Sequence, residues 1–243
     1  MAGGASTSGN QNIAIGVTAA DALTTGACNI ALGLNALGAA TTACDNIAIG
    51  NGPFGTGTTT GNDNIGMGRG TANDITSGAC NIGIGKEVMA NMTTGSLNIA
   101  IGKDAMTNVT TAQPDRNIAL GDCAMLGNAS SAGNDNIAIG GCAFDAFTTG
   151  ACNVAIGTGA MTVASNNNGN VAIGINAFGA SVNDGDFNVA IGCGALGNAD
   201  TSGDGNVAIG RNAADALLAG ACNIALGINA LGASTTGNDN IAL

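Results

Sequence analysis

The sequence predicts an all-β fold, a parallel β-solenoid (β-roll) of about 14 coils with 17–19 residues in each coil. The phrase Asn-Ile-Ala-Ile-Gly, first found at residues 12–16, recurs along the whole chain at steps of 17 to 19 residues. A period this short is typical of solenoids, in which each repeat forms one coil stacked on the previous one. Only 2% of the residues are aromatic, so small and branched side chains must fill the coils. We expect residues 1–243 to form a single β-solenoid domain.

The first residue of the phrase, which we number position zero, is Asn in every coil. Side-chain amides often satisfy backbone groups in turns and in stacked β structures. We therefore expect a ladder of hydrogen-bonded amides, which begins at Asn12 and ends at Asn240. The interior members of this Asn ladder are Asn29, Asn46, Asn64, Asn81, Asn98, Asn117, Asn136, Asn153, Asn170, Asn188, Asn206 and Asn223.

A short strand follows each Asn. Positions +1 and +3 are Ile, Val, Leu or Met in every coil, and position +2 is Ala, or Gly at Gly66 and Gly83. Because alternate residues of a strand share a face, we expect +1 and +3 to point into the core. On the same reasoning, Asn and the small residue at +2 point outward. Gly at +4 is expected to end the strand.

A second apolar column lies at position +8, which is Leu, Met or Phe in most coils. Three coils have Ala there instead, at Ala20, Ala72 and Ala214, and these carry a large residue at +11: Leu23, Ile75 and Leu217. Because cavities and overpacking both destabilise a core, the exchange indicates that positions +8 and +11 face one interior.

The two ends of the sequence read as parts of one coil, formed by residues 1–11 and 240–243, and we expect neighbouring subunits to share this coil. Both ends are ordinary repeats, since residues 12–48 match residues 206–242 at 28 of 37 positions. Solenoids usually need atypical end repeats, and a contact that does not close generates a filament. The alternative is that the sequence is a window of a longer repeat protein. The expected assembly interface consists of Met1, Ala2, Gly4, Ala5, Asn12, Ile13, Ile15, Asn240, Ile241 and Leu243.

Composition excludes several classes of function. A net charge of −11 argues against nucleic acid as a partner, since phosphate binding needs clustered Lys and Arg. No apolar run approaches the roughly 20 residues of a membrane-spanning helix, and residues 1–11 lack the pattern of a signal peptide. The chain has no His, Trp or Tyr, which removes the usual general base and the commonest metal ligand. We expect no enzyme activity and no cofactor, with calcium at the Asp-rich turns as a minor alternative.

Two further groups of residues are candidates for specific roles. Cys123 and Cys142 share position +6 on neighbouring coils and are candidates for an axial disulfide. Four other cysteines, Cys28, Cys80, Cys152 and Cys222, share position −1 on coils that are not adjacent, and we expect them to be small, semi-buried filler. Arg69, Lys86 and Lys103 share position +5 on three consecutive coils. They are either snorkelled surface residues or a lateral contact with an acidic patch of a neighbouring strand or with an anionic glycan.

The repeated phrase, as at residues 153–157, resembles the head repeats of trimeric autotransporter adhesins of the YadA type. The longer phrase that begins at Asn29 and continues to Thr41 and Thr42 is similar to repeats of bacterial and phage tail-fibre proteins. The resemblance implies a left-handed parallel β-roll with an adhesive or fibrous role. The sequence departs from the adhesin pattern in its longer coils and in having no segment like the adhesin stalk or membrane anchor. Trimer formation therefore rests on the resemblance of the repeats alone.

The sequence therefore predicts a structural subunit of a fibre that polymerises head to tail with itself, in one or several strands, into an extracellular or appendage filament. The alternative is the shaft or head of a trimeric phage tail fibre or bacterial adhesin that binds a surface receptor or glycan. In both cases we expect the protein outside the cell or on a virion, with no insertion into a membrane.

Overall fold

The computed structural model describes residues 8–109, 114–128, 131–146, 148–162, 166–179, 185–197 and 201–243. The chain divides into two compact units, Met1–Leu120 with Ala129–Ser131, and Gly121–Asn128 with Ala132–Leu243. Within the described residues, all regular structure is parallel β-sheet without helix, which confirms the predicted parallel β-solenoid. No helix that could cross a bilayer occurs in this part of the chain.

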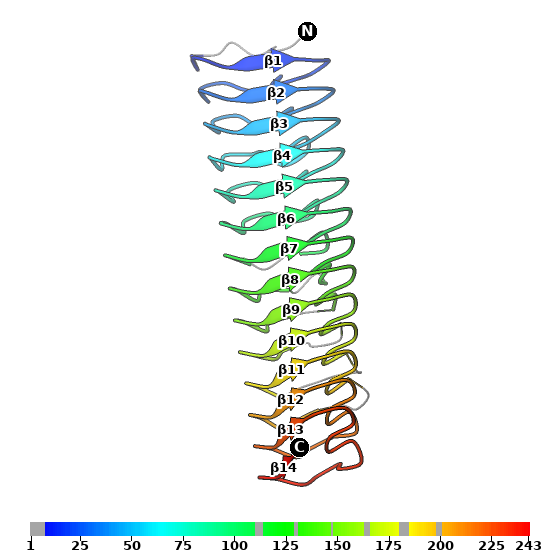
Figure 1. Ribbon diagram of the computed structural model, residues 1–243. Helices are drawn as coiled ribbons and strands as arrows, with labels where there is room; N and C mark the ends of the chain where they lie inside the picture. Colours follow the sequence, from blue (N-terminus) through cyan, green and yellow to red (C-terminus); the bar gives the residue numbers. More distant parts are fainter. Residues whose placement is uncertain are drawn as a thin grey trace. The chain divides into compact units, whose positions relative to one another are not determined.

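Each strand covers three residues of the repeated phrase, except for the last, which covers two. The strands of the first unit are β1 (Ile13–Ile15), β2 (Ile30–Leu32), β3 (Ile47–Ile49), β4 (Ile65–Met67), β5 (Ile82–Ile84), β6 (Ile99–Ile101) and β7 (Ile118–Leu120). Those of the second unit are β8 (Ile137–Ile139), β9 (Val154–Ile156), β10 (Val171–Ile173), β11 (Val189–Ile191), β12 (Val207–Ile209), β13 (Ile224–Leu226) and β14 (Ile241–Ala242). Within each unit, every strand pairs in parallel with the next strand along the chain (Figure 1). Equal repeat positions are aligned, as in Ala48 opposite Gly66.

The expected orientation of the strand is wrong. Ala at +2 is the buried residue of strands β2 to β13, apart from the two Gly positions, and the repeat Asn is also buried. The large residues at +1 and +3 point outward and are half-buried or exposed. The prediction that alternate residues share a face is correct, but the face predicted to be buried is the outer one.

The width of the coil explains the reversal. Position +8 on the opposite side of the coil supplies the large side chains of the core, and little room remains beneath the strand. A Cβ added to Gly66 would lie 2.6 Å from the ring of Phe54, which sits at +8 of the preceding coil. At Gly83, an added Cβ would lie 2.8 Å from the methyl group of Thr71. Because interiors are close-packed, neither Gly66 nor Gly83 leaves room for a larger side chain under its strand.

The prediction for positions +8 and +11 is confirmed. Leu37, Phe54, Met89, Met106 and Met125 are fully buried at +8. In the coils that have Ala at +8, the large residue at +11 is buried in its place: Leu23, Ile75 and Leu217. The two positions therefore face one interior, and some coils carry a large buried side chain at both, as at Met89 and Met92.

Each coil turns through residues with positive φ. Gly at +4 has φ between 126° and 142°, a region open almost only to glycine. An added Cβ at Gly50 would also run into the carbonyl group of Gly68 on the next coil. Positions −1, +6 and +8 adopt left-handed φ with ordinary side chains, including Phe54 and Met89. This conformation costs about 1–2 kcal/mol per residue, which burial of the +8 side chain offsets.

Candidate functional site

The most distinctive surface of both units is the row of outward side chains at positions +1 and +3, which we call the apolar face. In the first unit its exposed members include Met67, Ile84 and Ile101, with 37%, 37% and 40% of the residue surface accessible. In the second unit they include Ile209 and Leu226. No charged or polar residue occupies either position in any coil. Contiguous apolar surface of this kind marks interaction sites on soluble proteins.

The positions that flank the phrase add to the apolar face in some coils. At −1, Leu97 and Phe187 are exposed, and Phe187 has 68% of its surface accessible. At +5, large apolar residues are exposed in four coils: Val17, Leu34, Ile175 and Ile228. Large apolar side chains exposed in this way are costly in water.

The Asn side chains form a polar ladder beneath the strands. In the first unit, the backbone N–H of Asn81 donates to Oδ1 of Asn64 at 3.0 Å, and that of Asn98 donates to Oδ1 of Asn81 at 3.0 Å. The side-chain Nδ2 of Asn81 donates to the Gly95 carbonyl at 2.8 Å. Each amide thus satisfies an N–H and a turn carbonyl, which buried backbone groups require. The Asn ladder is a structural element, and it repeats in the second unit between Asn206 and Asn223.

Two polar atoms of the second unit break this regularity. Position −3 is Gly in most coils, but it is Asn167 in one coil, where the residue is fully buried. Oδ1 of Asn167 has no hydrogen-bond partner, and neither does Nδ2 of Asn188. Sequence reasoning missed this site, although the exception in the −3 column was visible. Unsatisfied buried polar atoms destabilise a fold.

The residues expected to form the assembly interface lie only partly within the described chain. Met1, Ala2, Gly4 and Ala5 fall outside it. Ile13 and Ile15 of β1 are exposed, and so are Ile241 and Leu243, at 73% and 91%. Asn12 and Asn240 continue the Asn ladder, since Asn12 Oδ1 accepts from the Asn29 N–H at 2.9 Å and the Asn240 N–H donates to Asn223 Oδ1 at 3.0 Å.

The basic column at +5 is engaged in ion pairs. Arg69 Nη2 lies 3.2 Å from Glu87 Oε1, and Lys86 Nζ lies 3.4 Å from the same oxygen. Lys103 Nζ lies 2.8 Å from Asp104 Oδ2. These acids relieve the like-charge repulsion along the column, and such exposed pairs contribute little to stability. The lateral contact of the three bases stays a prediction.

All eight cysteines are free thiols. Cys28, Cys80, Cys152 and Cys222 at position −1 are exposed, so the expectation that they are semi-buried filler is wrong. These residues adopt left-handed φ, and the sequence pattern did not reveal that their side chains are exposed. Cys123 and Cys142 are half-buried, and their disulfide stays a prediction.

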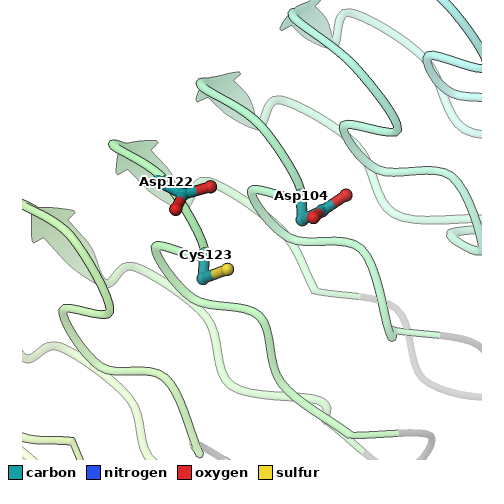
Figure 2. Close-up of side chains that lie close together, drawn as sticks. All are labelled: Asp104, Asp122 and Cys123. Atoms are coloured by element: carbon teal, nitrogen blue, oxygen red, sulfur yellow. The ribbon is translucent and has the colours of Figure 1, made fainter.

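Acidic side chains collect in the exposed turns after the strands. Figure 2 shows Asp104 in the turn that follows β6, and Asp122 and Cys123 in the turn that follows β7. Asp104 belongs to the first unit, where its carboxylate forms an ion pair with the ammonium group of Lys103. Asp122 and Cys123 belong to the second unit. In the second unit, burial also raises the pKa of Asp145, which follows the buried Phe144.

No protein-family model, curated protein or solved structure matches this chain.

Proposed function

We propose that this chain is a structural subunit of a fibre, whose copies associate with one another side by side through the apolar face and end to end along the coils. The observation that carries the proposal is the apolar face itself. Each coil presents one or two large aliphatic side chains outward while the core is closed with alanine beneath them. This arrangement leaves large aliphatic residues half-buried or exposed in the monomer, which favours their burial in an assembly.

The best-fitting occupant of the apolar face is another copy of the chain. The face carries side chains at the rise of the coils, about 4.8 Å, and a second solenoid presents rows at the same spacing. The two columns contain no charge that a partner would have to neutralise. Self-complementary packing of this kind is the usual basis of homo-oligomers.

End-to-end stacking is supported by the register of the strands. β1 and β14 pair with their neighbours in the same alignment as interior strands, and the Asn ladder reaches Asn12 and Asn240 without a change of pattern. A further coil would therefore meet ordinary ladder positions. Open strand edges of this kind invite pairing.

A second candidate function is the shaft or head of a trimeric tail fibre or adhesin. The same apolar face supports it, because three copies in a closed bundle would bury the face completely. The sequence resemblance to adhesin heads and tail fibres favours this form. In either form we place the protein outside the cell or on a virion.

Negative-stain electron microscopy of the purified protein separates these proposals. Long unbranched fibres whose length grows with protein concentration support the fibre subunit. Short rods of uniform length and width support the closed bundle. Isolated particles of the 23.0 kDa monomer at all concentrations would contradict both.

A further inference from the structure

Cys123 and Cys142 form a pair of thiols that the fibre proposal does not use. Both occupy position +6 of their coils, and consecutive coils bring them together within the second unit. Cys142 donates its backbone N–H to the Asp122 carbonyl at 2.9 Å, and Met125 donates its N–H to the Ala143 carbonyl at 2.9 Å. These two hydrogen bonds bracket Cys123 and fix the register, so the two cysteines lie directly above one another.

The two side chains also leave the backbone in the same direction. Cys123 has φ of 54° and Cys142 has φ of 52°, and both side chains are half-buried. Equivalent atoms on neighbouring β-strands are about 4.8 Å apart, so the two sulfurs are held near this separation when the side chains adopt the same rotamer. Among the cysteines, all of which lie in the described chain, this is the pair that shares a column on consecutive coils.

That separation is long for a disulfide, in which the Cβ atoms approach to roughly 3.5–4.5 Å and the sulfurs to about 2 Å. It matches a single soft metal ion between two thiolates. Metal–thiolate bonds are about 2.3 Å long, so a roughly linear S–metal–S unit spans about 4.6 Å. Of the ions that prefer thiolate ligands, Zn²⁺ requires four ligands in a tetrahedron, whereas Cu(I) is stable with two.

We propose that Cys123 and Cys142 bind one Cu(I) ion as a two-coordinate bis-thiolate site. Binding displaces the two thiol protons and leaves the copper in the same oxidation state, so that Cu⁺ and two thiols give one bis-thiolate complex of charge −1 and two protons. The carboxylate of Asp122, which lies within 4.8 Å of the Cys123 sulfur (Figure 2), adds negative charge that attracts the incoming cation. The site stands independently of the proposed fibre.

The test uses the full chain with the other six cysteines replaced by Ser, so that only Cys123 and Cys142 remain. Under anaerobic conditions the reduced protein is titrated against the Cu(I)–bicinchoninate complex, whose colour is lost as copper is transferred. We expect one Cu(I) per chain. Cys123→Ser and Cys142→Ser should each abolish the transfer. In the wild-type chain, Cys142→Ser should lower the stoichiometry of tightly held copper by one, whereas Cys80→Ser, an isolated exposed thiol, should not.

A second measurement tests the geometry without metal. Dibromobimane becomes strongly fluorescent when two neighbouring thiols of one molecule displace both its bromides. We expect this fluorescence with the two-cysteine chain and its loss in either single Ser variant. Absence of fluorescence in the two-cysteine chain would overturn the placement of the thiols. Fluorescence without copper transfer would overturn the metal site, and so would copper transfer that persists after Cys142→Ser.

Discussion

Glycine at position +4 shows how single residues set the geometry of the coil. Gly50 has φ of 132°, and the carbonyl of Gly68 on the next coil occupies the space of a side chain. Two independent constraints thus select glycine there. Gly52, two residues on, has φ of 73° but open space around an added Cβ, and its column accepts Asn35 with φ of 54°.

Gly50→Ala should therefore lower the free energy of unfolding by about 2–5 kcal/mol, since it combines backbone strain with overpacking. Chemical denaturation followed by circular dichroism measures the change. Gly52→Asn is the matched control and should change stability by less than about 0.5 kcal/mol. Equal effects of the two substitutions would show that contact between coils does not select the glycine.

Asn167 is a residue whose removal should help the fold. Its buried Oδ1 has no partner, and the equivalent position in another coil is Ala43, which is also fully buried. Asn167→Ala should raise the free energy of unfolding by about 1 kcal/mol, because it removes an unsatisfied polar atom. The control is Asn153→Ala, which deletes the ladder hydrogen bonds of the Asn153 side chain and should destabilise. A loss of stability in Asn167→Ala would contradict this assignment.

Asp145 gives the fold a dependence on pH. Burial raises the pKa of its carboxyl group, so the folded chain holds the proton more tightly than the unfolded chain. Its contribution to stability is therefore most favourable below the unfolded pKa and declines as pH rises through the folded pKa. Asp145→Asn should stabilise the protein at pH 7 relative to the wild type, and the advantage should vanish in acid. Denaturation midpoints across this pH range test it; an advantage that is equal at all pH values would count against it.

At the scale of the coil, the strand and the opposite wall are fitted to each other. An added Cβ at Gly66 would meet the ring of Phe54, and one at Gly83 would meet the methyl group of Thr71. Phe at +8 is also followed by Ala at +2 of the next coil, at Phe144 with Ala155 and at Phe178 with Ala190, so the size of the +8 residue alone does not decide between Gly and Ala.

Gly66→Ala should destabilise the protein by about 1–3 kcal/mol through overpacking. Phe54→Leu, which introduces the residue found at +8 in Leu37, should reduce this cost when the two changes are combined. A double-mutant cycle measures the coupling. Strictly additive effects would mean that the two residues do not share one space.

The packing of the strand against the opposite wall of the coil explains which parts of the fold could be predicted from the sequence. The period of the repeat and the alternation of Ile and Ala were sufficient for the solenoid and for the two faces of the strand. They did not determine which face is inside, because that depends on the width of the coil and on Phe54 and its equivalents across it. The left-handed turns at −1 also had no compositional signal, since Cys80, Asp63 and Leu97 all occur there. The exposure of the thiols and of the apolar face followed only from the structure.

At the scale of the whole molecule, two forces act against each other in the proposed assembly. The apolar face favours association, whereas a net charge of −11 on each copy repels its neighbours. Added salt screens that repulsion without weakening apolar contacts. We expect the apparent mass at fixed protein concentration to increase between low and physiological ionic strength, as measured by static light scattering. A decrease would indicate an interface built on ion pairs, such as those of Arg69 or Lys86.

The most direct measurement is the molar mass in solution, by light scattering after size exclusion, of the wild type and of Ile84→Glu combined with Ile101→Glu. Both substitutions place a charge on the apolar face. The control combines Thr60→Glu with Ser77→Glu, two exposed positions elsewhere on the first unit. If copies associate through the apolar face, the wild type and the control exceed the 23.0 kDa of one chain, while the face variant, folded by circular dichroism, is monomeric. A wild type that remains monomeric, or a face variant that assembles as well as the control, would contradict the proposed interface.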